Sequence, residues 1–380
     1  MSTSSGRPRI LVAFGTRPEA IKMFPVVAAL KETDRFDVRV AVTAQHREML
    51  DQVLALAEIQ PDIDLDLMMP GQSLDALSAR IITRFGEALD TEKPDRVLVH
   101  GDTLTTMMVT LACYFRRIPI GHVEAGLRSG DIYSPWPEEV NRKVTGAIAD
   151  LHFAPTSGAA NALKAENVSA DAIHVTGNTV IDALLFAKDK IATNANLAPQ
   201  ISELKARFSG KRIVAVTAHR RENFGDGMKQ IADALKELSQ RNDIAIIYPL
   251  HPNPNVAEVM QPALSGRDNI ALIEPLDYLD FVAMMEASDL MLTDSGGIQE
   301  EAPTLGKPVL VMRDTTERPE GIAAGTALLV GADKEAILQN CKTLLDNSSA
   351  YSAMAQAHNP YGDGTASRQI ADIIASAHAA

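Results

Sequence analysis

Short apolar segments alternate with amphipathic helical segments along nearly the whole chain of 380 residues. The first, Arg9–Phe14, is a continuous apolar run, which is typical of a strand buried on both faces of a parallel sheet. Further strands are expected at Val38–Thr43, Arg96–His100, Ile118–Val123, Leu151–Ala154, Arg212–Thr217, Ile244–Pro249, Asn269–Ile273, Asp289–Thr293 and Pro308–Met312. This alternation of strands and helices predicts an α/β protein with open, doubly wound parallel sheets.

A polar stretch at Lys190–Gln200 interrupts the alternation, which then restarts. At roughly 100–200 residues per domain, a chain of this length holds two domains. We therefore expect two doubly wound Rossmann-like domains that face each other across a cleft. Residues 8–185 would form the first domain and residues 186–364 the second, and a final helix within residues 365–380 would return to the first.

Composition argues against several classes of protein. The chain has 36 Lys and Arg against 49 Asp and Glu, and this net charge of −13 disfavours a nucleic-acid partner. There is no run of about 18 apolar residues, so no membrane-spanning helix is expected. Cys113 and Cys341 are the only cysteines, too few for a disulfide framework or a thiolate metal cluster. Together with a polar N-terminus unlike a secretion signal, this predicts a cytoplasmic protein.

Ligands of open α/β sheets bind beyond the carboxyl ends of the strands, so the residues that follow each strand are the informative ones. After the first strand, Thr16 and Glu19 have the spacing of a capping box at a helix N-terminus. Arg17 and Lys22 add positive charge there, where free N–H groups favour an anion. A purely structural cap would explain Thr16 and Glu19 but not Arg17.

Three carboxylates follow other strands of the first domain. Asp102 and Glu124 come directly after strands, and Glu138 opens a helix behind a proline-rich loop. The structural alternatives are a helix N-cap for Asp102 and compensation of a helix dipole by Glu138 and Glu139. A metal site at His100 and Asp102 is disfavoured because no further ligands have suitable spacing.

The second domain has a different set of residues at its strand ends. His219–Arg221 place a histidine and two arginines in one turn, which suits a diphosphate, although a solvated surface turn has the same composition. Ser295–Gly297 lie between a strand and a helix, as in a phosphate cradle. Neither a dinucleotide fingerprint nor a P-loop is present. The residues thus predict a nucleotide-diphosphate site here, and proton transfer by the acids of the first domain.

In order along the chain, these segments closely resemble the non-hydrolysing UDP-N-acetylglucosamine 2-epimerases. The resemblance runs from about Ile10 to Asn359–Gly364 and includes both domains. The motifs that carry it are FGTRPEAIKM (Phe14–Met23), VTAQHREML (Val42–Leu50), HGDT (His100–Thr103), GHVEAGLRSGD (Gly121–Asp131), SPWPEE-NR (Ser134–Arg142), TGNTVIDAL (Thr176–Leu184), HRREN (His219–Asn223), DSGGIQEEAP (Asp294–Pro303) and VLVMRDTTERPE (Val309–Glu320).

The resemblance implies a two-domain fold like that of GT-B glycosyltransferases, in a homodimer. It implies UDP-N-acetylglucosamine (UDP-GlcNAc) and UDP-N-acetylmannosamine (UDP-ManNAc) as substrate and product, for bacterial surface polysaccharides. No nicotinamide, other cofactor or metal is implied. In the family's reaction a base removes the proton at C2, UDP leaves C1 to form 2-acetamidoglucal, and UDP then adds back.

The resemblance also implies roles for individual residues. Asp102, Glu124 and Glu138 match the catalytic acids, and His219 matches a catalytic residue that contacts the phosphates. Glu301 matches the residue that binds the ribose hydroxyls. The positions that match ligand contacts are Arg17, Lys22, Asp102, Glu124, His219, Ser295, Gly296, Gly297, Glu301 and Arg318.

Two further groups of positions follow from the resemblance. Phe281 lies where the family packs against uracil, and Leu276 stands where a relative has Gln, so only a main-chain contact would persist there. Gln45, His46 and His251 match the region where some members bind a second UDP-GlcNAc as an activator. Those regulated members have an Arg where this chain has Gly71, so the sequence leaves activation open.

Three other functions remain as alternatives. A GT-B glycosyltransferase would use the same nucleotide sugar but would need an acceptor. A hydrolysing epimerase would release UDP and free N-acetylmannosamine, and a non-catalytic sensor would bind the nucleotide sugar without turnover.

Overall fold

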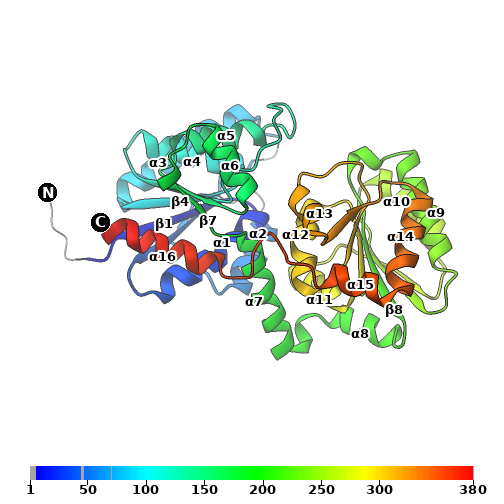
Figure 1. Ribbon diagram of the computed structural model, residues 1–380. Coiled ribbons are helices and arrows are strands. Elements are labelled where there is room, and N and C mark those ends of the chain that lie inside the picture. Colours follow the sequence, from blue (N-terminus) through cyan, green and yellow to red (C-terminus); the bar gives the residue numbers. More distant parts are fainter. Residues whose placement is uncertain (1–5, 44–46, 70, 380) are drawn as a thin grey trace. The chain divides into compact units, whose positions relative to one another are not determined.

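The computed structural model describes residues 6–43, 47–69 and 71–379, and the chain divides into two compact units (Figure 1). Unit 1 extends to Ala183 and resumes at Tyr361, and unit 2 is Leu184–Pro360. The first boundary falls inside helix α7 (Thr179–Thr193). Within the described residues, no helix is both long enough and apolar enough to cross a membrane.

In the described part of unit 1, seven strands form one parallel sheet in the order β3-β2-β1-β4-β5-β6-β7. The C-terminal helix α16 (Ala366–Ala379) packs on α1 (Arg17–Glu32) (Figure 1). The strands are β1 (Arg9–Phe14), β2 (Asp37–Val42), β3 (Ile63–Asp64), β4 (Arg96–His100), β5 (Ile120–Val123), β6 (Leu151–Ala154) and β7 (Ile173–Val175).

The helices of unit 1 cover an aliphatic core. One cluster joins β1, β4 and β5 to α3 and α4 through side chains such as Leu11, Val97, Ile81 and Val109, all fully buried. Burial of such side chains on both faces of the sheet explains the continuous apolar runs in the sequence. The remaining helices are α2 (Arg47–Leu56), α3 (Leu74–Glu92), α4 (Leu104–Tyr114), α5 (Glu138–Ile148) and α6 (Ser157–Ala165).

In the described part of unit 2, six strands form a second parallel sheet in the order β10-β9-β8-β11-β12-β13. These strands are β8 (Arg212–Thr217), β9 (Ile244–Pro249), β10 (Ile270–Ile273), β11 (Leu290–Thr293), β12 (Val309–Val311) and β13 (Ala327–Leu329). The helices are α8 (Pro199–Arg207), α9 (Asp226–Leu238), α10 (Pro254–Leu264), α11 (Tyr278–Ala287), α12 (Gly296–Glu301), α13 (Pro319–Ala324), α14 (Lys334–Asp346) and α15 (Ser348–Ala355).

The predicted α/β class with two parallel sheets is therefore confirmed. Three short strands have no counterpart in the prediction, namely β3, β7 and β13, because most of their residues are not buried, unlike those of the similarly short β12. The polar stretch Lys190–Gln200 includes the end of α7 and the beginning of α8. Helix α7 continues to Thr193 because its earlier turns bury apolar residues such as Ile181 and Leu184, and α8 already begins at Pro199.

Each sheet has one switch point, where the order in which strands are added reverses. The strand order reverses between β1 and β4 in unit 1, and between β8 and β11 in unit 2. Ligands of open α/β sheets bind beside such a switch point, at the carboxyl ends of the strands. A ligand is therefore expected to contact the residues that follow these four strands or their neighbours in the sheet.

Candidate active site

Glu19 lies at the switch point of unit 1 and ties two helix N-termini together. Its Oε2 accepts hydrogen bonds from the N–H groups of Gly15 (3.0 Å) and Thr16 (2.8 Å), so the predicted capping box is present. Its Oε1 accepts from the hydroxyl of Thr103 (2.7 Å), the N-cap of α4. Burial raises the pKa of Glu19, against these hydrogen bonds, which lower it. The beginnings of α1 and α4 are thus held side by side.

Glu124 follows β5 and is the centre of a small polar cluster. Its Oε2 forms an ion pair with Lys22 of α1 and accepts a hydrogen bond from Asn178 Nδ2 at 2.8 Å. His100 Nε2 lies 3.7 Å from its Oε1, and burial lowers the pKa of His100 to about 4. Glu124 itself has φ of +60°, a left-handed conformation that is uncommon outside glycine and concentrated at functional sites.

Asp102 follows β4 and lies next to this cluster. Its Oδ2 forms an ion pair with Arg142 of α5, and its main-chain carbonyl accepts from Asn141 Nδ2 at 2.8 Å. Burial raises the pKa of Asp102, the Arg142 guanidinium opposes that rise, and the charge of Glu124 adds to it. Two carboxylates that influence each other in this way can hold different protonation states at one pH.

The adjacent acids Glu138 and Glu139 at the start of α5 have opposite surroundings. Glu139 is fully buried, and it accepts hydrogen bonds from the N–H groups of Ser129 (3.1 Å) and Gly130 (3.3 Å). Glu138 is partly exposed and has no ion pair or side-chain hydrogen bond with any described residue. Glu139 therefore supports the loop, while Glu138 is available to a ligand.

Unit 1 thus brings several predicted residues to one switch point. Lys22, Asp102 and Glu124 interact there directly or through their charges. Arg17 is the first residue of α1 and is half-buried, and it forms no ion pair with any residue the structure describes. Gln45, which the resemblance assigned with His46 to a second ligand site, lies outside the described residues, as does His46.

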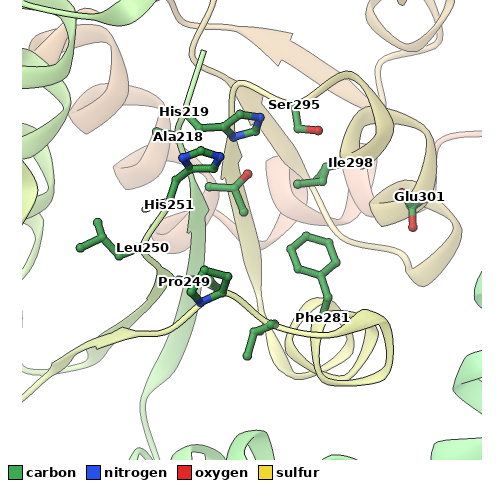
Figure 2. A pocket seen from close by; sticks show the side chains of 12 residues that line it. Ala218, His219, Pro249, Leu250, His251, Phe281, Ser295, Ile298 and Glu301 are labelled. Carbon is green, nitrogen blue, oxygen red and sulfur yellow. The ribbon is translucent and has the colours of Figure 1, made fainter. Parts of the chain in front are cut away.

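Unit 2 has a pocket of about 260 Å³ at its own switch point (Figure 2). Two imidazole rings, those of His219 and His251, stack in it with centroids 5.2 Å apart and planes inclined by 13°. Figure 2 shows Phe281 across the pocket from these rings. The pocket is lined by Thr217, Ala218, His219, Pro249, Leu250, His251, Pro275, Leu276, Phe281, Ser295, Ile298 and Glu301.

Asp294 organises the turn that carries His219. It is fully buried, and its Oδ2 accepts hydrogen bonds from the N–H groups of His219 and Arg220, both at 2.8 Å. Asn223 Nδ2 donates to the same oxygen at 3.2 Å. Burial lowers the pKa of His219, while the Asp294 carboxylate opposes this shift. The position of the His219 ring is thus set by the strand end from which Asp294 projects.

The glycine-rich segment is open to a ligand. Ser295 is the N-cap residue of α12, and its N–H donates to Thr293 Oγ1 at 2.9 Å. A Cβ atom built on Gly296 would meet no atom within 4 Å, so there is room for an atom of a ligand beside the main chain. Arg318 is not among the residues that line the pocket, and its guanidinium forms an ion pair with the buried Glu300.

The pocket gathers most of the predicted nucleotide-binding residues. His219, Leu276, Phe281, Ser295 and Glu301 line it together, and Gly296 and Gly297 directly follow Ser295. His251, which the resemblance assigned to the second ligand site, lies against His219 in this same pocket. Within the described residues, no cluster of three His, Cys, Asp or Glu side chains could hold a metal ion.

Sequence reasoning did not single out several residues that build these sites. Asn178 contacts Glu124, Arg142 contacts Asp102, and Asp294 holds the turn of His219. Each lies inside a quoted motif, namely TGNTVIDAL, SPWPEE-NR and DSGGIQEEAP. The motifs were therefore a usable signal, but the partner of each side chain is a residue far away in the sequence.

Comparison with known proteins gives one consistent family. A family model described as UDP-N-acetylglucosamine 2-epimerase matches residues 28–375. A UDP-N-acetylglucosamine 2-epimerase of Yersinia pestis is 54% identical over 95% of this chain and 97% of its own length. A crystal structure of UDP-GlcNAc 2-epimerase from Neisseria meningitidis bound to UDP-GlcNAc has a TM-score of 0.88, with 47% identity over 97% of this chain and 100% of the other. The UDP complex of MnaA from S. aureus has a TM-score of 0.87 at 46% identity, over 98% of this chain and 97% of the other.

Proposed function

This chain belongs to the UDP-N-acetylglucosamine 2-epimerase family, and we propose that it interconverts UDP-GlcNAc and UDP-ManNAc by eliminating UDP and adding it back. Its identity to the curated epimerases extends over almost the full length of both chains. The family membership supports epimerisation of a nucleotide sugar. Support for the elimination route has to come from the residues of this chain.

We propose that the pocket of unit 2 holds UDP. Phe281 offers an aromatic face for the uracil ring, and Glu301 offers a carboxylate for the ribose hydroxyls. The diphosphate would lie at His219, the Ser295 hydroxyl and the N–H groups of Gly296 and Gly297, because a helix N-terminus favours an anion. Arg318 would add a cation near the end of the same site, although its guanidinium also pairs with Glu300.

The proposed reaction moves one proton and one leaving group in each direction. A carboxylate removes the proton from C2, the C2–H electron pair forms the C1=C2 double bond, and the C1–O bond breaks with its electrons on UDP. In the return step a carboxylic acid delivers a proton to the other face of C2, and an oxygen of the β-phosphate attacks C1. Inversion therefore needs at least two carboxyl groups in different protonation states.

The observation that carries this proposal is the pair of carboxylates at the switch point of unit 1. Asp102 and Glu124 are largely buried, each has a cationic partner, and the charge of one raises the pKa of the other. Carboxylates do not favour binding of a diphosphate, so a pair of them at a switch point points to proton transfer. Glu138, the partly exposed acid at the start of α5, would be the third member.

Incubation with UDP-GlcNAc in D2O, followed by NMR of the product, tests the route. Elimination and re-addition would give UDP-ManNAc with deuterium at C2, because the proton returns from a side chain that has exchanged with solvent. Product that retains protium at C2 would contradict elimination. Turnover only with an added acceptor would indicate a glycosyltransferase, and UDP with free N-acetylmannosamine would indicate a hydrolysing epimerase.

We also infer that the protein acts in the cytoplasm as a homodimer, and that its product serves surface-polysaccharide synthesis. The resemblance to the family supports all three inferences. The free thiols of Cys113 and Cys341, both buried, support a reducing compartment. Light scattering on the purified protein tests the dimer, because a monomeric mass at working concentration would contradict it.

A further inference from the structure

Two neighbouring side chains of helix α5 contact Asp102, one at its carboxylate and the other at its main-chain carbonyl. Arg142 forms an ion pair with the Asp102 carboxylate, and Asn141 Nδ2 donates to the Asp102 carbonyl at 2.8 Å. The pair is well shielded, since 11% of the Arg142 side chain and 28% of the Asp102 side chain are exposed. The main chain and the carboxylate of Asp102 are thus both fixed by a helix 40 residues further along the chain.

The guanidinium of Arg142 is itself restrained on its other side. Its Nη1 lies 3.4 Å from Oε2 of Glu139, a residue with no exposed surface. Glu139 also accepts hydrogen bonds from the N–H groups of Ser129 and Gly130, so its buried carboxylate is satisfied. Arg142 is therefore held between two carboxylates, one in the candidate active site and one in the loop that leads into α5.

We propose that Arg142 is a positioning residue, which fixes the orientation of the Asp102 carboxylate and stabilises its charged form for proton transfer. Glu139 in turn holds Arg142 in place. This inference rests on the proposed function. Glu138 begins the same helical turn as Glu139. Helix α5 would then set the positions of two of the three proposed acids, Glu138 directly and Asp102 through Arg142.

Charges around Asp102 predict how it responds to loss of this contact. The charged groups that act on it are Arg142 from α5, Lys22 from α1 and Glu124 after β5. Burial raises the pKa of Asp102 and Glu124 raises it further, while Arg142 and Lys22 lower it. Removal of Arg142 leaves the raising influences less opposed. The limb of the pH–rate profile that Asp102 controls should then move to higher pH, whether Asp102 acts as base or as acid.

The test measures kcat and KM for conversion of UDP-GlcNAc to UDP-ManNAc across both pH limbs in Arg142→Met and Arg142→Lys. In Arg142→Met we expect kcat to fall by about 10²-fold, the scale for a misplaced catalytic group, with little change in KM. One limb should shift to higher pH. Arg142→Lys should shift it less, because an ammonium keeps the charge but does not span two carboxylates as a guanidinium does.

Two control variants separate positioning from general effects. Arg84→Met removes one positive charge from an exposed ion pair with Glu87 elsewhere in unit 1, and it should leave the profile unchanged. Asn141→Ala removes the hydrogen bond to the Asp102 carbonyl without any change of charge, so it should lower kcat while both limbs stay in place. Circular dichroism and thermal unfolding show whether unit 1 of each variant is folded, because the proposed UDP pocket lies in unit 2 and does not report on it.

The outcomes are distinct. If Arg142→Met does not fold, Arg142→Lys decides the question. A folded Arg142 variant whose limbs coincide with those of the unsubstituted protein overturns the proposal, whether or not kcat falls. If the unsubstituted protein converts no UDP-GlcNAc at all, the proposed function is contradicted instead.

Discussion

The two units use the same sheet topology to present opposite chemistry at equivalent places. In unit 1, carboxylates follow the central strands and are held by side chains, such as Lys22 on Glu124 and Arg142 on Asp102. In unit 2, the buried carboxylate of Asp294 faces inward and collects N–H donors. The groups left for a ligand there are an imidazole and a glycine-rich helix N-terminus.

This contrast shows that the switch point determines where a ligand binds but not which chemical groups the ligand meets. A carboxylate that accepts several main-chain N–H groups is a structural anchor, whereas Asp102 and Glu124 have cationic side chains as partners. The comparison predicts that substitutions in unit 1 change the rate of catalysis, while those in unit 2 change the affinity for UDP.

The largest effect is expected from the acids of unit 1. Asp102→Asn, Glu124→Gln and Glu138→Gln keep the shape of the side chain but remove its proton transfer, so each should lower kcat by about 10²-fold or more. UDP affinity should change little, and at least one variant should release UDP and 2-acetamidoglucal. Exposed Glu87→Gln on α3 is the control. Near-normal turnover in all three would redirect attention to Glu139, Asp131 and His122.

A smaller effect, on binding, is expected from Asp294→Asn in unit 2. The neutral amide oxygen would accept the N–H groups of the His219 turn less strongly than the carboxylate does, and the amide NH2 would replace the oxygen beside His219 Nδ1. Loss of this charge should weaken UDP binding by about 10-fold or more. Calorimetric titration with UDP measures this change. Asp226→Asn, on the exposed first turn of α9, should bind as the unsubstituted protein does. Equal affinity of the two variants would contradict the anchoring role of Asp294.

The smallest effect concerns stability at low pH and distinguishes the buried histidines of unit 1 from exposed ones in unit 2. His122 donates through Nε2 to the Gly101 carbonyl at 2.7 Å, and burial lowers its pKa from 6.5 to about 3. Its contribution to stability is therefore full above pH 6.5 and lost as the pH falls toward 3. From pH 6.5 to one unit below, one such histidine costs about 1 kcal/mol of unfolding free energy.

Denaturant unfolding at these two pH values checks this prediction. His122→Gln keeps a donor for Gly101 but does not titrate, so it should lose less stability on acidification than the unsubstituted protein. His358→Gln removes an exposed histidine of unit 2 and should behave as the unsubstituted protein does. An identical pH dependence in all three proteins would show that protonation of His122 does not matter for stability.

Much of the fold follows from the sequence because its signals are local. Continuous apolar runs mark strands that are buried on both faces, and their alternation with helices leaves parallel sheets as the natural architecture. The strand-end rule then leads to the segments around Asp102, Glu124, His219 and Ser295, since the carboxyl ends of parallel strands share one edge. The short strands β3, β7 and β13 are not predicted because most of their residues are not buried, whereas the similarly short β12 is fully buried.

The burial and the partners of individual side chains could be learned only from the tertiary structure. Neighbouring residues of a helix point about 100° apart, so Glu138 stays accessible while Glu139 is buried against Ser129 and Gly130. Whether such a carboxylate is an anchor or a reactive group depends on which distant segment packs beside it. Asn178 reaches Glu124 across 54 residues and Asp294 reaches His219 across 75. The sequence by itself determined which residue types stand at the strand ends, and only the packing of remote segments decided their partners, their burial and hence their charge.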